Sequence, residues 1–92
     1  MSYKIIRTDT YFKKLKKFIK KHPEVLDRYI KVIKLLELNP YHPSLRLHKL
    51  KGNLKEYYSV SITMQYKVVI DFIIEENKII LLDIGTHNEV YK

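Results

Sequence analysis

The spacing of the apolar residues changes once along the chain, and this change constrains the fold more than any other feature of the sequence. Between residues 11 and 36, apolar side chains recur at the spacing of one face of an α-helix. From residue 56 onward they recur at every second position, as on one face of a β-strand. Helices followed by strands predict an α+β domain in which the helices pack on an antiparallel sheet.

The first half is expected to hold a short strand and two helices. Residues 3–7 predict the strand, and the Thr-Asp-Thr segment that follows can cap a helix N-terminus. Pro23 disfavours helical geometry in the residue before it, so the first helix should stop there and a second should begin with Pro23 in its first turn. The second helix should end at Asn39, giving an antiparallel helical hairpin.

The second half is expected to hold a basic loop and three strands. Residues 41–51 follow directly after Pro40, contain Pro43, and alternate basic with apolar positions, which indicates a surface loop. The strands should cover roughly residues 56–62, 66–74 and 78–84. The basic side chains of the loop are Arg46, His48, Lys49 and Lys51.

If three-residue loops join these strands, alternate residues should face the helices and form the core: Tyr58, Val60, Ile62, Tyr66, Val68, Ile70, Phe72, Ile80, Leu82 and Ile84. The other face should be a mixed polar surface available to a ligand: Tyr57, Ser59, Ser61, Lys67, Val69, Asp71, Ile73, Ile79, Leu81 and Asp83. This register sets Lys67 across from Gly85. It also sets Asp83 opposite Val69, within diagonal reach of Lys67.

Length and charge limit the possible functions. The 92 residues leave room for one domain, residues 1–92, and carry 18 Lys and Arg against 10 Asp and Glu, a net charge of +8. Such an excess favours a polyanion such as nucleic acid, although an acidic protein or an anionic membrane surface would also be attracted. The chain has no cysteine, signal-peptide pattern or apolar run of membrane-spanning length, so we expect a cytoplasmic protein without cysteine chemistry or a membrane partner.

The order of these segments and several short motifs resemble the RelE and ParE superfamily of type II toxins, most closely its YafQ-like branch. The motifs are His42-Pro43, residues 48–52 (HKLKG), 57–62 (YYSVSI), 66–69 (YKVV) and 82–91 (LDIGTHNEVY). The resemblance covers nearly the whole chain. It implies a toxin that cleaves messenger RNA, usually on the ribosome, needs no metal or other cofactor, and is neutralised by a cognate antitoxin.

Matching the motifs position by position assigns the branch's proton-transfer histidine to His87, the histidine of the basic loop to His48 and the final aromatic residue to Tyr91. The chain also departs from the pattern. Relatives commonly have Arg where this chain has Lys67. The protein after which the branch is named has His, Asp, Trp and Arg in the places of Ser61, Gln65, Tyr66 and Asp83.

Histidine and lysine suit the metal-independent cleavage of RNA by its own 2′-hydroxyl. Imidazole can move protons near neutral pH, and a cation can stabilise charge that develops on the phosphate. We therefore expect His87 and His48 to transfer protons or hold a phosphate, and Lys67 to stabilise the transition state. The expected RNA contacts, basic groups and tyrosines suited to base stacking, are Arg46, Lys49, Lys51, Tyr57 and Tyr91.

Two other functions remain open at the level of sequence. A ParE-type toxin has the same fold but inhibits DNA gyrase, and the two histidines His48 and His87 argue against this alternative. A catalytically weak RNA- or ribosome-binding module is made plausible by the departures at Lys67 and Asp83. The four histidines have no metal-ligand spacing, so no metal site is expected.

Overall fold

The computed structural model describes residues 2–50, 57–73 and 76–90, without the side chains of residues 72 and 73. The helices and strands follow one another in the order β1 (Lys4–Arg7), α1 (Asp9–Lys21), the 3₁₀ turn η1 (Pro23–Val25), α2 (Leu26–Leu38), the 3₁₀ turn η2 (Pro43–Leu45), β2 (His48–Lys49), β3 (Tyr58–Ser61), β4 (Tyr66–Ile73), β5 (Lys78–Thr86) and α3 (His87–Val90).

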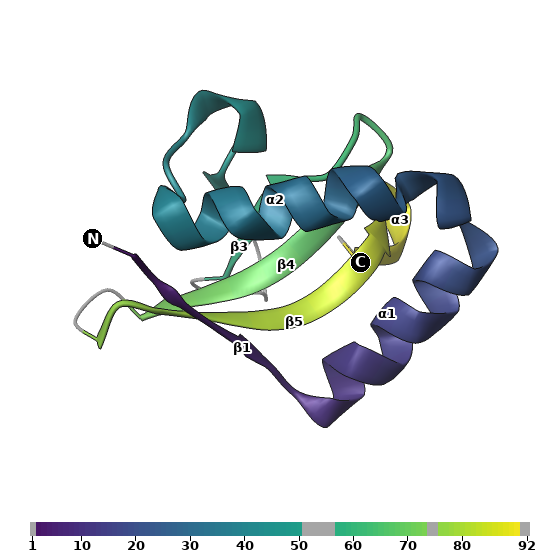
Figure 1. Ribbon diagram of the computed structural model, residues 1–92, viewed down its shortest axis with the longest axis horizontal. Helices are drawn as coiled ribbons and strands as arrows, with labels where there is room; N and C mark the ends of the chain where they lie inside the picture. The colour runs from purple at the N-terminus through teal and green to yellow at the C-terminus, as the bar shows by residue number, and fades with distance from the viewer. Residues whose placement is uncertain (1, 51–56, 74–75, 91–92) are drawn as a thin grey trace.

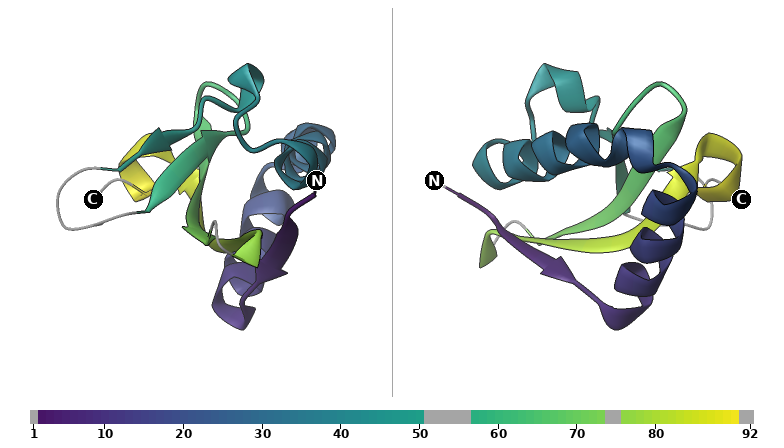
Figure 2. Two further views of the ribbon diagram at one scale, coloured as in Figure 1. Left: turned by 90° about the vertical axis from the view of Figure 1, so that its left-hand side faces the viewer. Right: turned by 45° about the vertical axis from the view of Figure 1, so that its right-hand side comes forward.

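The strands form one five-stranded sheet in the order β1-β5-β4-β3-β2 (Figure 1). Neighbouring strands run antiparallel except β1, which lies parallel to β5 and makes the sheet mixed. Figure 2 shows α1 and α2 on one side of the sheet and α3 on the other. The first side is called the helix face below, and the second the α3 face. The predicted α+β class, with helices packed on a sheet, is confirmed.

The helix boundaries follow from local signals in the sequence. The Thr8 side chain caps α1 by accepting a hydrogen bond from the Tyr11 amide at 3.1 Å. Residue 22 leaves helical geometry, and Pro23 begins η1, as expected from a proline at that point. From η1 the two helices diverge at a wide angle rather than lying along each other (Figures 1 and 2). Each therefore reaches a different part of the sheet.

The main core lies between the sheet and the two long helices. Tyr11 of α1 is fully buried, and its hydroxyl lies 2.8 Å from that of Tyr29 in α2. Burial and this neighbour raise the pKa of Tyr11 well above its usual value, so its hydroxyl stays neutral. Phe12, the next residue along α1, lies within the apolar helical pattern of the sequence but is 49% exposed. The buried strand residues of this core are Val60, Val68, Ile70, Ile79, Leu81 and Ile84, and Ile62 joins them from just after β3.

A β-bulge corrects part of the predicted core. Val69 pairs with Asp83, but the next residue, Ile70, pairs with Leu81, which leaves Leu82 as an extra residue in β5. The extra residue reverses the alternation on its N-terminal side, so Ile79 and Leu81 are fully buried on the helix face, where Ile80 and Leu82 were expected. Leu82 packs on the α3 face. Beyond the bulge Ile84 lies in the core, as predicted.

The segment predicted as a loop contains two short elements. The turn η2 inserts the fully buried Leu45 into the core, and β2 adds an edge strand in which His48 pairs with Ser59. On the α3 face a second, smaller apolar cluster joins Leu50, Val69 and Val90. Within the described residues, none of the helices has the length and apolar character required to span a bilayer.

Candidate functional site

The predicted transition-state cation, Lys67, lies in the middle of the sheet on β4. Its neighbours across the sheet are Ser61 on β3 and Gly85 on β5, and the pairing with Gly85 confirms the predicted register. The ammonium group donates a hydrogen bond of 2.8 Å to the Ser61 hydroxyl. Partial burial lowers the pKa of Lys67, and the positive charge of Arg46 lowers it further. The two cations therefore lie close enough to repel each other.

Arg46 reaches this site from an unusual backbone conformation. Its φ is 50°, in the left-handed region that non-glycine residues seldom adopt. The buried Leu45 before it and Leu47 after it both pack into the core, so the chain is fixed on either side of the arginine. Left-handed geometry at such a residue costs about 1 kcal/mol or more and is concentrated at functional positions. The packing of the two leucines holds Arg46 in it.

His48 belongs to a set of cross-strand pairs that lies two residues along the strands from the pairs made by Lys67. Its partner across the sheet is Ser59, which pairs with Val69, which in turn pairs with Asp83. Residues that pair directly project to the same side of a sheet, and so do residues two apart on one strand. His48 is therefore on the face that carries Ser61 and Lys67. Its side chain is exposed.

His87 is the first residue of α3, directly after β5. Thr86 and Glu89 fix the backbone there: the Thr86 amide donates to the Glu89 carboxylate at 2.8 Å, and the Glu89 amide donates to the Thr86 hydroxyl at 3.3 Å. This reciprocal pair is a capping box. Hydrogen bonding to the carboxylate from the Thr86 backbone amide, and to a smaller extent from the Thr86 side chain, lowers the pKa of Glu89. His87 is exposed and lies two residues from Gly85, the partner of Lys67.

Gly85 is needed for this arrangement. A Cβ at residue 85 would lie 2.9 Å from the Glu89 Oε1 atom and 3.2 Å from the Glu89 Cβ. Any larger residue would push the carboxylate away from the Thr86 amide.

Asp83 does not neutralise Lys67, although the sequence suggested that it could. Its carboxylate lies 3.2 Å from the ammonium of Lys14 on α1 and accepts a hydrogen bond of 2.8 Å from the Ile84 amide. Strand β1 pairs with β5 only as far as Leu81, so the edge beyond that point is open to the side chain. Although the register places Asp83 within diagonal reach of Lys67, its carboxylate turns towards α1 and pairs with Lys14 instead.

The remaining predicted RNA contacts are not gathered in one place. Lys49 pairs with Tyr58, which packs against the helix-face core, so Lys49 belongs to the opposite side of β2 from His48. Tyr57 is half-buried and packs against the cluster on the α3 face. Lys51 and Tyr91 lie outside the described residues.

Two of the positions that depart from the branch's pattern have structural roles. The Ser61 hydroxyl accepts the bond from Lys67. The Tyr66 hydroxyl lies 3.3 Å from the Nδ1 atom of His22, and its ring packs edge-on against Phe18 at 5.1 Å. In the described ranges, no three His, Asp or Glu side chains are grouped so that they could hold a metal ion.

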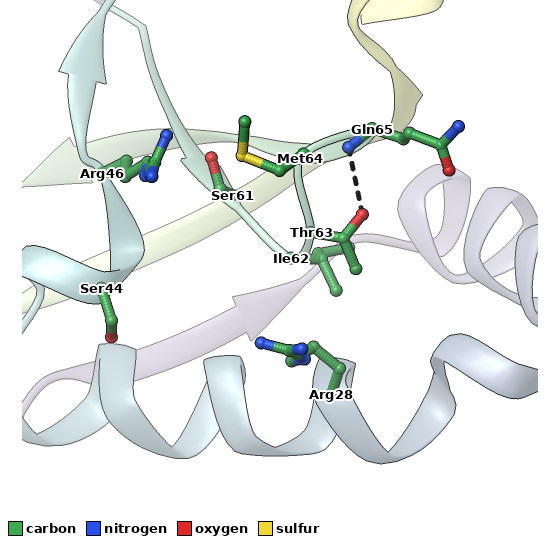
Figure 3. A pocket seen from close by; sticks show the side chains of 8 residues that line it. All are labelled: Arg28, Ser44, Arg46, Ser61, Ile62, Thr63, Met64 and Gln65. Atoms are coloured by element: carbon green, nitrogen blue, oxygen red, sulfur yellow. Dashed lines mark hydrogen bonds between the residues drawn. The ribbon is translucent and has the colours of Figure 1, made fainter.

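A hollow of about 560 Å³ adjoins Lys67, between α2 and the turn from β3 to β4. Figure 3 shows the guanidinium groups of Arg28 and Arg46 and the hydroxyl of Ser61 directed towards this space. Sequence reasoning missed Arg28. It is one of many charged residues on the polar side of α2, and nothing in the helical pattern distinguishes it from the others.

Comparison with known proteins agrees with this fold. Three crystal structures are similar over nearly their whole length. YafQ from E. coli strain BL21(DE3) is 15% identical with a TM-score of 0.79, covering 98% of this chain and 99% of that one. A chain of the E. coli DinJ-YafQ toxin-antitoxin complex is 17% identical with a TM-score of 0.78, and the match covers 100% of both chains. A chain of the archaeal RelE-RelB complex from Pyrococcus horikoshii OT3 is 18% identical with a TM-score of 0.73, and the match covers 98% of this chain and 100% of that one.

At these identities the similarity to solved structures establishes the fold. Among curated proteins, none matches the chain by sequence. The family itself comes from a sequence model of the bacterial toxin YafQ of type II toxin-antitoxin systems, which matches residues 3–92. The chain therefore belongs to the YafQ family of type II toxins, as its motifs suggested.

Proposed function

We propose that this toxin is an endoribonuclease that cleaves messenger RNA on the ribosome, in the cytoplasm, through attack by the 2′-hydroxyl of the RNA. The observation that carries the proposal is the pair of cations formed by Lys67 and Arg46. Burial and mutual repulsion lower the pKa of Lys67, and its only hydrogen bond within the described residues goes to a neutral hydroxyl. Two cations whose charges act on each other, one of them half-buried, suit a phosphodiester.

The cleavage step needs three roles. One group removes the proton from the 2′-hydroxyl, whose oxygen then bonds to phosphorus. A cation stabilises the extra negative charge on the phosphate. A third group protonates the 5′-oxygen as its bond to phosphorus breaks, which leaves a 2′,3′-cyclic phosphate and a free 5′-hydroxyl. We assign the charge role to Lys67 and the proton roles to His87 and His48.

The positions of the two histidines support these roles. His48 shares a face with Lys67 in the next register row, and His87 follows the strand end that pairs beside Lys67. Both side chains are exposed, so an RNA strand can reach them. The proposed RNA contacts are Arg46, Lys49, Lys51, Tyr57 and Tyr91, and among them the charge of Arg46 acts on Lys67.

The partner of such a toxin is a cognate antitoxin. The structures of DinJ-YafQ and RelE-RelB are both toxin-antitoxin complexes, and both toxins share this fold. We propose that an antitoxin encoded beside this toxin binds it and blocks RNA cleavage.

The test is to incubate purified toxin with a defined messenger RNA, with and without ribosomes positioned on it, and to map the cut ends. We expect cuts within ribosome-bound codons, a 2′,3′-cyclic phosphate at each new end, and no loss of rate with a chelator. Supercoiling by purified gyrase is measured alongside. Intact message together with inhibited gyrase would replace this proposal with a ParE-type function, and intact message on ribosomes that bind the toxin would leave a silent binding module.

A further inference from the structure

The hollow beside Lys67 has the chemistry of a site for the RNA backbone. No acidic residue among the described ones lines it, and it holds the cations Arg28 and Arg46. It continues into a second hollow of about 240 Å³, which shares Arg28 and Ser61 and adds Lys31. Within the described residues, no hydrogen bond or ion pair joins either guanidinium group to a carboxylate. None of the described carboxylates therefore pairs with the arginines of this hollow.

A third hollow, elsewhere on the molecule, is also basic, but carboxylates line it. It lies between α1 and the end of β5 and holds Lys14, Lys17 and Lys21. The carboxylates of Asp83 and Glu89 line the same space, and Asp83 pairs with Lys14 at 3.2 Å. Carboxylates thus partly compensate the positive charge of its lysines, whereas no described carboxylate lines the hollow that holds Arg28 and Arg46.

The hollow also connects to the proposed cleavage site. Ser61 lines it and accepts the hydrogen bond from Lys67, so a strand with its phosphate at Lys67 can continue into it. Arg46 links the hollow to Lys67. Its side chain lines the hollow, and its charge lowers the pKa of Lys67. At the mouth lies Met64, 76% exposed, whose flexible thioether side chain offers an apolar surface to a base.

We infer that this hollow is a subsite for the nucleotide next to the cleaved bond, with Arg28 and Arg46 binding its phosphate and Met64 contacting its base. The inference rests on the proposed function and names the part of the chain that positions the substrate. The volume of the hollow, about 560 Å³, falls in the range of sites for small ligands, about 300 to 1,000 Å³. Guanidinium groups suit phosphate because they donate two parallel hydrogen bonds.

The test compares Arg28→Gln with Lys34→Gln. Both changes remove one positive charge from an exposed position on α2, but Lys34 lines neither hollow. Binding is measured by fluorescence anisotropy with single-stranded RNA whose 2′-hydroxyls are all methylated, so that no cleavage occurs. The oligonucleotides form two nested series, lengthened one nucleotide at a time on the 5′ or the 3′ side.

We expect Arg28→Gln to weaken binding of the longer oligonucleotides roughly three- to tenfold and to leave the shortest unaffected. The slope of log affinity against log salt should fall by roughly 0.7, the value for one phosphate contact on a single strand. Lys34→Gln should change affinity by less than about twofold, because an exposed and distant charge is screened.

Equal effects of the two substitutions at every length would overturn the inference. So would an Arg28→Gln variant that binds RNA normally but loses affinity for the cognate antitoxin, since the hollow would then be a protein-docking site. Failure of the proposed function has a different signature. It would appear as unmethylated RNA that the wild-type toxin leaves uncut, whatever the result of the Arg28 comparison.

Discussion

Replacing Gly85 with alanine should loosen the start of α3 and slow RNA cleavage. The added Cβ would lie 2.9 Å from the Glu89 Oε1 atom, well inside van der Waals contact. The carboxylate can move away only by giving up its 2.8 Å bond to the Thr86 amide. Losing a helix cap typically costs about 1 kcal/mol of stability, so Gly85→Ala should destabilise the fold by about that amount.

A double-mutant cycle with Glu89→Ala isolates this mechanism. Glu89→Ala removes the carboxylate and should itself cost about 1 kcal/mol. If the clash with Glu89 is the cause, the double variant should also lose about 1 kcal/mol, whereas independent effects would add to about 2 kcal/mol. The contact that remains is the 3.2 Å approach to the Glu89 Cβ, which a shift of the α3 backbone can relieve.

Urea denaturation followed by circular dichroism measures these differences. A change of 1 kcal/mol should move the midpoint by roughly 0.3 to 1 M for a domain of this size. Cleavage rates are then compared under conditions in which all variants are folded, and both Gly85→Ala and Glu89→Ala should be slower than wild type because His87 begins α3. Additive destabilisation, or a Gly85→Ala variant as stable as wild type, would refute the reasoning.

Three further predictions concern the site, its pH dependence and the core. His87→Ala should reduce the cleavage rate by about 10² to 10⁴-fold and leave stability unchanged. Lys67→Met should reduce the rate by about 10² to 10³-fold, whereas Lys67→Arg should retain activity. Single-turnover cleavage rates check both predictions. The Glu89 pKa is lowered in the fold, so its stabilising effect should be complete above the ordinary value of 4.5 and be lost as the pH falls through the lower, folded-state pKa; stability against pH should lose this component in Glu89→Gln. Tyr11→Phe should cost about 1 to 3 kcal/mol because it leaves the buried Tyr29 hydroxyl unpaired, and adding Tyr29→Phe should cost less than the sum in denaturant titrations.

Features set by neighbouring residues could be predicted from the sequence. The cap at Thr8 and the break before Pro23 depend on a few adjacent side chains, and both were expected. The pairing of Lys67 with Gly85 was also predicted, from regular alternation between β4 and β5, although the bulge at Leu82 interrupts that alternation. The cap and the helix break need only local backbone geometry.

Features that depend on the partner strand could not be predicted. The run from Ile79 to Leu82 is apolar at every position, so alternation cannot say which residues face the helices, and the bulge that decides it carries no glycine or other local signal. Asp83 can turn to α1 because the pairing of β5 with β1 stops at Leu81. The hollow at Arg28 combines α2, η2 and a strand turn, and its existence depends on how these segments pack.

The parallel pairing of β1 with β5 has a consequence for synthesis. β1 lies near the start of the chain, yet its hydrogen-bonding partner is the last strand to leave the ribosome. Contacts between such distant segments give a high contact order and slow folding, because a long loop must close before any bond is gained. The sheet therefore lacks the pairing of β1 with β5 until every strand between them has been synthesised.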